Sequence, residues 1–209
     1  MCYYIQNKAS TKALIERFNA SFKLPKLYQP QNEISAFAGE QLPIITHEDK
    51  SSFEFADWGL IPNWAKDEEI ASKTKNARIE TIHEKPSYRD CISQRCIIPA
   101  TGFYEWKWHD SKGKQKEKFL IYPKEHSIFA FAGLCNLWTD PHSQKSILTF
   151  TILTSAAEGI MKDIHNTKQR MPLIINPSDE KKWLENNKVN FITDFDADSL
   201  TPMNLKFDF

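Results

Sequence analysis

Long hydrophobic runs are absent from the 209-residue sequence. No stretch approaches the roughly 18 consecutive apolar residues of a membrane-spanning helix. The first residues also lack the basic and then apolar run of a secretory signal. We therefore expect a protein of the cytoplasm that makes no membrane contact.

The cysteines also lack the spacing that is typical of a zinc site. None of the four cysteines forms a CxxC pair or stands near a ladder of histidines. In a cytoplasmic protein such cysteines are expected to be reduced thiols; they are Cys2, Cys91, Cys96 and Cys135. The sequence thus predicts no metal site and no cofactor.

Neither sign of charge is in excess, because 27 Lys and Arg residues balance 27 Asp and Glu residues. The field of the whole molecule cannot draw it onto a polyanion, so any binding of nucleic acid must depend on a local patch. Repeats, low-complexity runs and linkers are also lacking. We therefore expect one domain over residues 1–209.

Strand patterns outnumber helix patterns. Apolar and alternating runs predict strands at residues 2–5, 42–45, 53–60, 96–99, 102–108, 119–122, 128–134, 146–153 and 171–175. Helical spacing of apolar residues predicts helices at residues 11–22, 79–85, 156–164 and 178–184, with irregular chain at 24–39 and 61–76. The predicted fold class is α+β, a single mixed domain built around an antiparallel, barrel-like β-sheet with flanking helices.

Cys2 carries the most specific chemistry. A small second residue normally permits removal of Met1, which would leave Cys2 with a free α-amine beside its thiol. An α-amine with a pKa of about 8 is partly neutral at physiological pH, so it can attack an aldehyde, and the sulfur can then close on the imine carbon. The product is a thiazolidine ring. Position alone does not establish this chemistry, because a cysteine at position 2 is more often incidental.

Four further segments strengthen the interpretation. They are Trp-Gly-Leu-Ile-Pro at residues 58–62, Asn-Ala-Arg-Ile-Glu-Thr at 76–81, Arg-Cys-Ile-Ile-Pro-Ala-Thr-Gly-Phe-Tyr-Glu-Trp at 95–106, and Ile-His at 164–165 ahead of Arg-Met-Pro at 170–172. In this order, and together with Cys2, they resemble the SRAP family (SOS response-associated peptidase) of abasic-site processing proteins. The resemblance runs from residue 2 to about residue 184 and leaves a carboxy-terminal tail at about 190–209.

The resemblance implies the SRAP fold and a role in the response to DNA damage. It implies that Cys2 forms a covalent thiazolidine crosslink with the ring-opened sugar of an abasic site in single-stranded DNA, which shields the lesion. It also implies peptidase and hydrolase activity, from removal of the residue before the cysteine, and lyase-like Schiff-base chemistry. We expect a monomer that joins the nucleoid when it binds DNA.

By position in the family motifs, the catalytic residues would be Cys2, Asn76, Glu105 and His165. Asn76 would hold the sugar and Cys2. Glu105 stands between aromatic residues, an apolar setting that raises a carboxyl pKa and suits proton transfer during ring opening. His165 would act as a general acid and base, because imidazole titrates near neutrality. An ion-pair role for Glu105 and a capping or core role for His165 are the alternatives.

The resemblance also implies phosphate contacts. Arg78 would bind the phosphate beside the lesion, because a guanidinium offers a planar fork to phosphate oxygens. A buried pair with Glu80 or Glu105 is the alternative. Lys73 and Lys75 would add contacts to the DNA backbone.

An apolar wall for base stacking is predicted from Pro62 and Trp64, since stacking on aromatic rings tolerates any base sequence. Trp64 stands in a polar loop, where core packing and stacking are both open. For Trp58, which lies in a strand pattern, core packing is the preferred interpretation.

Two segments depart from the family pattern. Tyr3 and Tyr4 replace the Gly-Arg that often follows the cysteine, and residues 35–39 lack the usual Asn and Pro. His165 also stands three residues further from the Arg-Met-Pro segment than is usual. These changes bear on DNA contacts more than on the chemistry of Cys2.

Two other functions stay open from the sequence. One is a cysteine peptidase that acts on other proteins, with Cys2 as nucleophile and His165 as base. The other is a non-covalent module that binds single-stranded DNA through its aromatic and basic residues. The peptidase would tolerate a residue added before Cys2, and the non-covalent module would tolerate Cys2→Ala.

Overall fold

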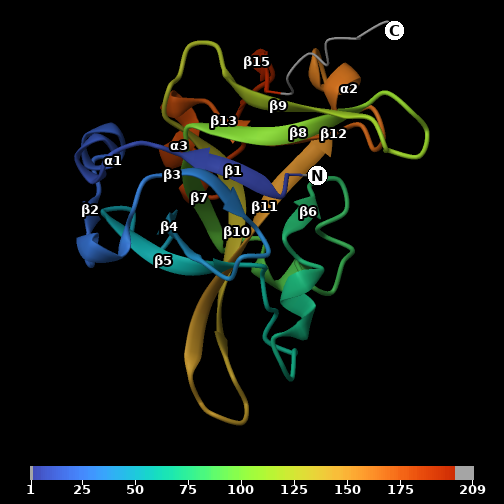
Figure 1. Ribbon diagram of the computed structural model, residues 1–209. Helices are drawn as coiled ribbons and strands as arrows, with labels where there is room; N and C mark the ends of the chain where they lie inside the picture. Colours follow the sequence, from blue (N-terminus) through green and yellow to red (C-terminus); the bar gives the residue numbers. More distant parts are fainter. Residues whose placement is uncertain (1, 201–209) are drawn as a thin grey trace, which may run out of the picture.

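Two β-sheets make up most of residues 2–200, the part of the chain that the computed structural model describes (Figure 1). In the first sheet the strand order is β15-β9-β8-β1-β3, and all neighbours are antiparallel. Its strands are β1 Tyr4–Asn7, β3 Gln31–Ser35, β8 Gly102–Trp108, β9 Lys116–Pro123 and β15 Phe195–Ser199.

The second sheet closes on itself. Strands β11, β5, β4, β7 and β10 follow one another, and a further β10–β11 pairing completes a five-stranded barrel. Shorter strands extend it: β6 and β12 pair with β11, β2 with β5, β13 with β10, and β14 with β13. The bounds are β2 Ser21–Phe22, β4 Gln41–Thr46, β5 Ser52–Trp58, β6 Asn76–Arg78, β7 Arg95–Ala100, β10 Phe129–Thr139, β11 Ser146–Ala156, β12 Arg170–Pro172, β13 Ile174–Ile175 and β14 Phe191–Ile192. The predicted α+β class with a barrel-like sheet is confirmed.

The helices are short: α1 Thr11–Phe18, α2 Met161–Ile164 and α3 Glu180–Leu184, with 3-10 turns at Pro25–Leu27, Glu69–Ser72, Arg89–Cys91 and Pro177–Asp179. Ser10 caps α1 by accepting a hydrogen bond from Ala13 N at 3.1 Å. The helix predicted to reach residue 22 stops earlier because Asn19 turns left-handed, with φ at 49°. No helix among residues 2–200 is long and apolar enough to cross a membrane.

The helix predicted at residues 79–85 is wrong, because residues 79–84 form consecutive turns. Ile79 N donates to Thr154 O of β11 at 3.0 Å, and Thr81 N donates to Arg78 O at 3.0 Å. The first donor thus continues the pairing of β6 with β11 instead of starting a helix. Tertiary hydrogen bonds outweigh the local helical spacing here.

Two more elements differ from prediction for similar reasons. The helix predicted at 156–164 shrinks to α2, since β11 continues to Ala156, which pairs with Arg170 of β12. The irregular chain predicted at 24–39 contains β3, which pairs with β1. In both places pairing with a distant strand decides the conformation.

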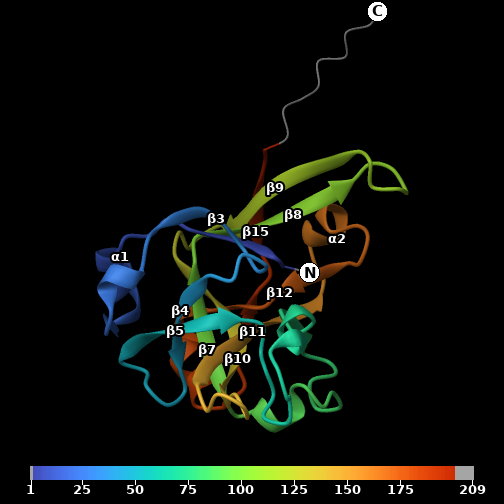
Figure 2. The ribbon, with the colours of Figure 1, turned by 60° about the horizontal axis from the view of Figure 1, so that its bottom comes forward.

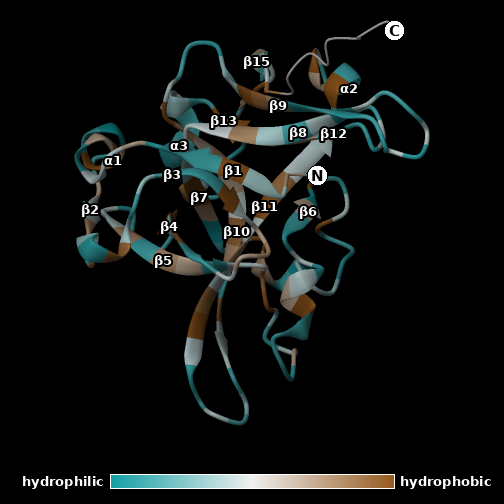
Figure 3. Cartoon of the chain, in the orientation of Figure 1, coloured by the Kyte–Doolittle hydropathy of each residue, from teal (hydrophilic) through white to brown (hydrophobic). Residues whose placement is uncertain are grey.

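Apolar side chains of both sheets share one core. Phe103 of β8 lies 6.0 Å, ring centroid to centroid, from Phe131 of β10 and from Phe195 of β15. Figure 3 shows hydrophobic residues along the barrel strands and hydrophilic residues in the outer loops. The sheets are therefore joined by packing, and β15 near the end of the chain takes part in it.

The start of β1 lies near β12 and α2 in two views of the molecule (Figures 1 and 2). Strands β6 and β12 flank the end of β11, and α2 packs on β8. Segments that are far apart in sequence therefore meet at one edge, around the start of β1.

Candidate active site

Cys2 is fully buried at this edge, two residues before the first residue of β1. Its carbonyl oxygen accepts a hydrogen bond from Asn76 Nδ2 at 2.8 Å, and its Sγ lies 3.9 Å from Tyr4 O. Burial, reinforced by the charge of Glu105, raises the pKa of the Cys2 thiol. At neutral pH the sulfur is therefore protonated.

Asn76 is held in place by strand pairing. It opens β6, which runs parallel to β11 with Asn76 opposite Ile152, and its backbone oxygen accepts a bond from Tyr88 Oη at 3.1 Å. While Nδ2 binds the Cys2 carbonyl, Oδ1 is buried and has no hydrogen-bond partner among residues 2–200. This oxygen is an acceptor next to Cys2 that a hydroxyl group could satisfy.

Glu105 is a buried carboxyl in the middle of β8, with 5% of its surface exposed. The strand pairs with β1 through residues 102–104 and with β9, where Glu105 lies opposite Phe119. Burial raises the pKa of Glu105 to about 7. Both protonation states are thus populated at neutral pH, which a group that donates and accepts protons requires.

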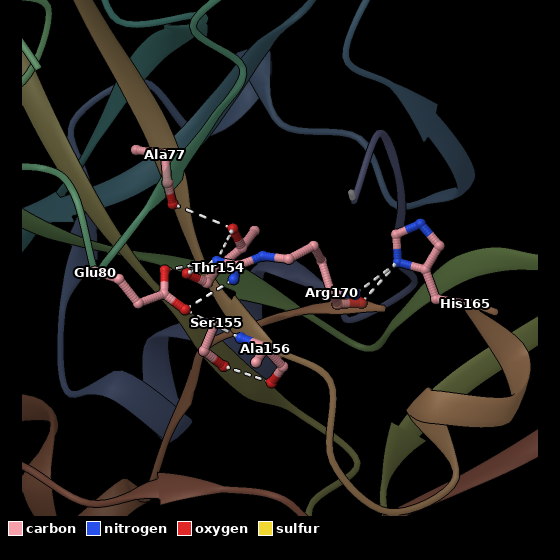
Figure 4. Close-up of polar contacts among 7 residues, drawn as sticks. All are labelled: Ala77, Glu80, Thr154, Ser155, Ala156, His165 and Arg170. Carbon is pink, nitrogen blue, oxygen red and sulfur yellow. Dashed lines mark hydrogen bonds and ion pairs between the residues drawn. The ribbon is translucent and has the colours of Figure 1, made fainter. Parts of the chain in front are cut away.

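His165 follows α2 and lies 3.9 Å from Glu105, measured from Nδ1 to Oε1. Nδ1 is also 2.7 Å from Arg170 O, a contact that needs a proton on this nitrogen (Figure 4). Burial lowers the pKa of His165 to about 4. The ring is therefore neutral at pH 7, with its lone pair assigned to Nε2.

The fold brings the four residues predicted as catalytic into one cluster. Asn76 touches Cys2, the charge of Glu105 acts on Cys2, and His165 lies beside Glu105. They come from the chain start, β6, β8 and the end of α2. No group of three or more His, Cys, Asp or Glu side chains among residues 2–200 could hold a metal ion.

Arg170 is a part of this region that sequence reasoning did not assign. Its guanidinium forms a two-pronged pair with Glu80 at 2.7 and 2.9 Å and donates to Thr154 O at 2.7 Å (Figure 4). Its backbone oxygen orients His165. The pair ties the turns after β6 to β12. In the sequence, Arg170 is marked by the Arg-Met-Pro segment, but this segment does not identify Glu80 as its partner.

We expect Arg170→Met to lower the free energy of unfolding by about 2 kcal/mol, because Glu80 and Thr154 O lose the guanidinium that binds them. Urea titration measures the change. Lys12→Met is the control, since the Lys12–Glu16 pair is exposed and 3.8 Å long, and we expect it to cost below about 0.5 kcal/mol. Equal losses in both variants would contradict a structural role for Arg170.

The residues predicted to contact DNA divide into two groups. Lys73 and Arg78 are exposed, and Trp64 is 54% exposed while its Nε1 donates to Pro86 O at 3.1 Å. Pro62 is buried, and the half-buried Lys75 donates through Nζ to Trp58 O. Among the predicted DNA contacts, the exposed side chains are therefore Lys73, Arg78 and Trp64.

The structure also bears on the alternative roles of Trp58 and Arg78. Trp58 is buried and stacked on Phe150 at 5.9 Å, as expected for core packing. Glu80 pairs with Arg170, and Arg78 makes no ion pair with any of residues 2–200. Arg78 is thus exposed on β6, two residues beyond Asn76.

Comparisons with known proteins point in one direction. A family model described as SOS response associated peptidase (SRAP) matches residues 1–204. The abasic site processing protein YoqW of Bacillus subtilis (strain 168) is 42% identical over 173 residues, covering 82% of this chain and 74% of that protein. The abasic site processing protein YoaM of the same organism is 41% identical over 191 residues, covering 90% and 80%. The crystal structure of a protein from Bacteroides thetaiotaomicron superposes with a TM-score of 0.87 at 33% identity, covering 96% and 93%.

Proposed function

Because this chain belongs to the SOS response associated peptidase (SRAP) family, we propose that it processes abasic sites in single-stranded DNA by a covalent crosslink through Cys2. The observation that carries the proposal is the cluster of Cys2, Asn76, Glu105 and His165 at one edge of the fold. An abasic sugar in its ring-opened form offers the aldehyde that an amino-terminal cysteine can trap.

The crosslink forms in two steps after removal of Met1. The amine of Cys2 adds to the aldehyde carbon, and loss of one water leaves an imine. The sulfur then bonds to the same carbon while the thiol proton passes to nitrogen, which gives a thiazolidine. Overall, one water leaves, and no oxidant or reductant is needed.

The protonation states of the cluster fit these steps. Glu105, with a pKa of about 7, can protonate the departing hydroxyl and later accept a proton from the thiol. Neutral His165 can take a proton from a sugar hydroxyl. Asn76 Oδ1 can accept a hydrogen bond from a sugar hydroxyl. Each role uses a group in the state that its surroundings favour.

The protonation states of Cys2 and His165 argue against a thiol peptidase that acts on other proteins. Such an enzyme needs a thiolate paired with a protonated histidine. Here burial raises the pKa of the Cys2 thiol and lowers that of His165, so the neutral pair is favoured. In our proposal the amine attacks first, and the sulfur acts only once the imine is in place.

The proposal is tested with a single-stranded oligonucleotide that carries one abasic site. We expect a slower band on a denaturing gel and an intact mass equal to protein without Met1 plus oligonucleotide minus one water. An oligonucleotide with every base intact is the control. A protein shown by mass spectrometry to lack Met1, yet forming no band, would overturn the proposal.

For Arg78→Ala we expect weaker non-covalent binding of single-stranded DNA and a logarithmic salt dependence reduced by about 0.7, as for the loss of one phosphate contact. Binding is measured with an unreactive tetrahydrofuran analogue of the abasic site at several salt concentrations. Lys112→Ala, on the loop between β8 and β9, is the control and keeps the slope. An unchanged slope for Arg78→Ala would remove this arginine from the DNA contact.

A further inference from the structure

Two aromatic rings, those of Tyr3 and Phe37, pack against each other at the residue that follows Cys2 in the chain. Tyr3 follows the cysteine in sequence, and its ring lies 5.2 Å, centroid to centroid, from that of Phe37. Tyr3 is partly buried, whereas Phe37 is 59% exposed. An apolar ring is thus presented to solvent and backed by the neighbour of the reactive residue.

Phe37 is held there by the turn between β3 and β4. Ala36 N donates to Tyr3 O at 2.8 Å, and Phe37 N donates to Ser35 Oγ at 3.2 Å. Gly39 closes the turn with φ at +74°, a backbone conformation that residues with a side chain rarely adopt. The position of Phe37 is therefore fixed relative to the start of the chain.

The backing ring also adjoins the reactive groups. Tyr3 lies between Cys2 and Tyr4, whose strand pairs with β8, the strand of Glu105. Burial and the charge of Glu105 raise the pKa of Tyr3, which agrees with its place at the rim of the cluster. The exposed Phe37 ring thus packs on the partly buried Tyr3 ring, and Tyr3 is the chain neighbour of the buried Cys2.

We propose that Phe37, backed by Tyr3, is the stacking platform for the base that adjoins the abasic sugar. This inference rests on the proposed function. An abasic nucleotide has no base of its own, so the nearest apolar face on the DNA is that of a neighbouring base. Stacking on an aromatic ring is worth about 1–3 kcal/mol per base and does not depend on base identity. The platform makes the protein sense a base on one side of the lesion.

The test varies the neighbour of the abasic site. Oligonucleotides carry either an adenine or a base-free spacer on the 5′ or the 3′ side of the lesion, and the initial crosslinking rate is measured at subsaturating DNA. For the parent protein we expect the spacer on one side to slow crosslinking about five-fold or more, as for the loss of one stacked base. Phe37→Ala should remove this difference, and Phe37→Trp should restore it.

A second measurement does not depend on the chemistry. The adenine is replaced by 2-aminopurine beside an unreactive tetrahydrofuran site, and its fluorescence is followed on binding. We expect quenching by the parent protein and its loss in Phe37→Ala. Leu137→Ala is the matched control, because Leu137 is 61% exposed on β10, and it should behave like the parent.

The outcomes separate the two proposals. No crosslink from the parent protein counts against the proposed function, whatever Phe37 does. Normal crosslinking with equal rates for adenine and spacer on both sides, or with a Phe37→Ala variant identical to the parent, would overturn the platform alone. Melting curves confirm that the variants fold.

Discussion

Cys2→Ser should lose the heat-stable adduct, with a yield at least about 100-fold below that of the parent protein. Serine is small, so Met1 removal and the amine are retained and an imine can still form. The hydroxyl is a much weaker nucleophile than the thiol, and the ring does not close. The measurement is a denaturing gel run with and without borohydride, which reduces the imine and should recover a band only in the treated sample.

Internal cysteines provide the matched controls for this experiment. Cys91, Cys96 and Cys135 are free and buried, as Cys2 is, but none is next to the amino terminus. Cys135→Ser should therefore crosslink like the parent protein. A stable adduct in Cys2→Ser, or loss of the adduct in Cys135→Ser, would contradict a thiazolidine at residue 2.

Glu105→Gln is expected to slow crosslinking by about 100-fold or more, since general acid–base groups contribute factors of that size. Glutamine keeps the shape of the side chain but neither gives nor takes a proton. In the parent protein the rate should change with an apparent pKa near 7, the value to which burial raises Glu105. That inflection should be absent from the residual rate of the variant, as measured by single-turnover time courses between pH 5 and 9.

Glu105→Gln should slow crosslinking but stabilise the fold at neutral and higher pH. A carboxyl whose pKa is raised by folding contributes stability that is complete below its ordinary pKa of 4.5 and is lost as the pH rises through about 7. The shift corresponds to about 3 kcal/mol, an upper value for one buried group. Relative to the parent protein, the free energy of unfolding of Glu105→Gln should therefore rise by up to about 3 kcal/mol between pH 5 and pH 8. Urea titrations at these pH values measure the change.

Glu117→Gln is the control for the pH effect. Hydrogen bonding to Ser199 and His109 lowers the pKa of Glu117, so its replacement should give no gain between these pH values. A Glu105→Gln variant that crosslinks normally, or that gains nothing at pH 8, would show that Glu105 is not the buried proton carrier of the site.

Sequence alone determined the family and the general fold class of this protein. A cysteine at position 2 would supply an amine–thiol pair in any fold once Met1 is removed, and the motifs around Asn76, Glu105 and Arg170 predicted the family. The balance of strand over helix patterns was sufficient for the α+β class, because alternation is a local property.

Tertiary structure decided which residues meet and in what protonation state. Pairing of β6 with β11 replaces the predicted helix at 79–85 and sets Asn76 against Cys2. Burial, which no local pattern measures, moves the pKa of Glu105 up and that of His165 down. The contact between Tyr3 and Phe37 likewise depends on strand register, a long-range property that sequence spacing does not encode.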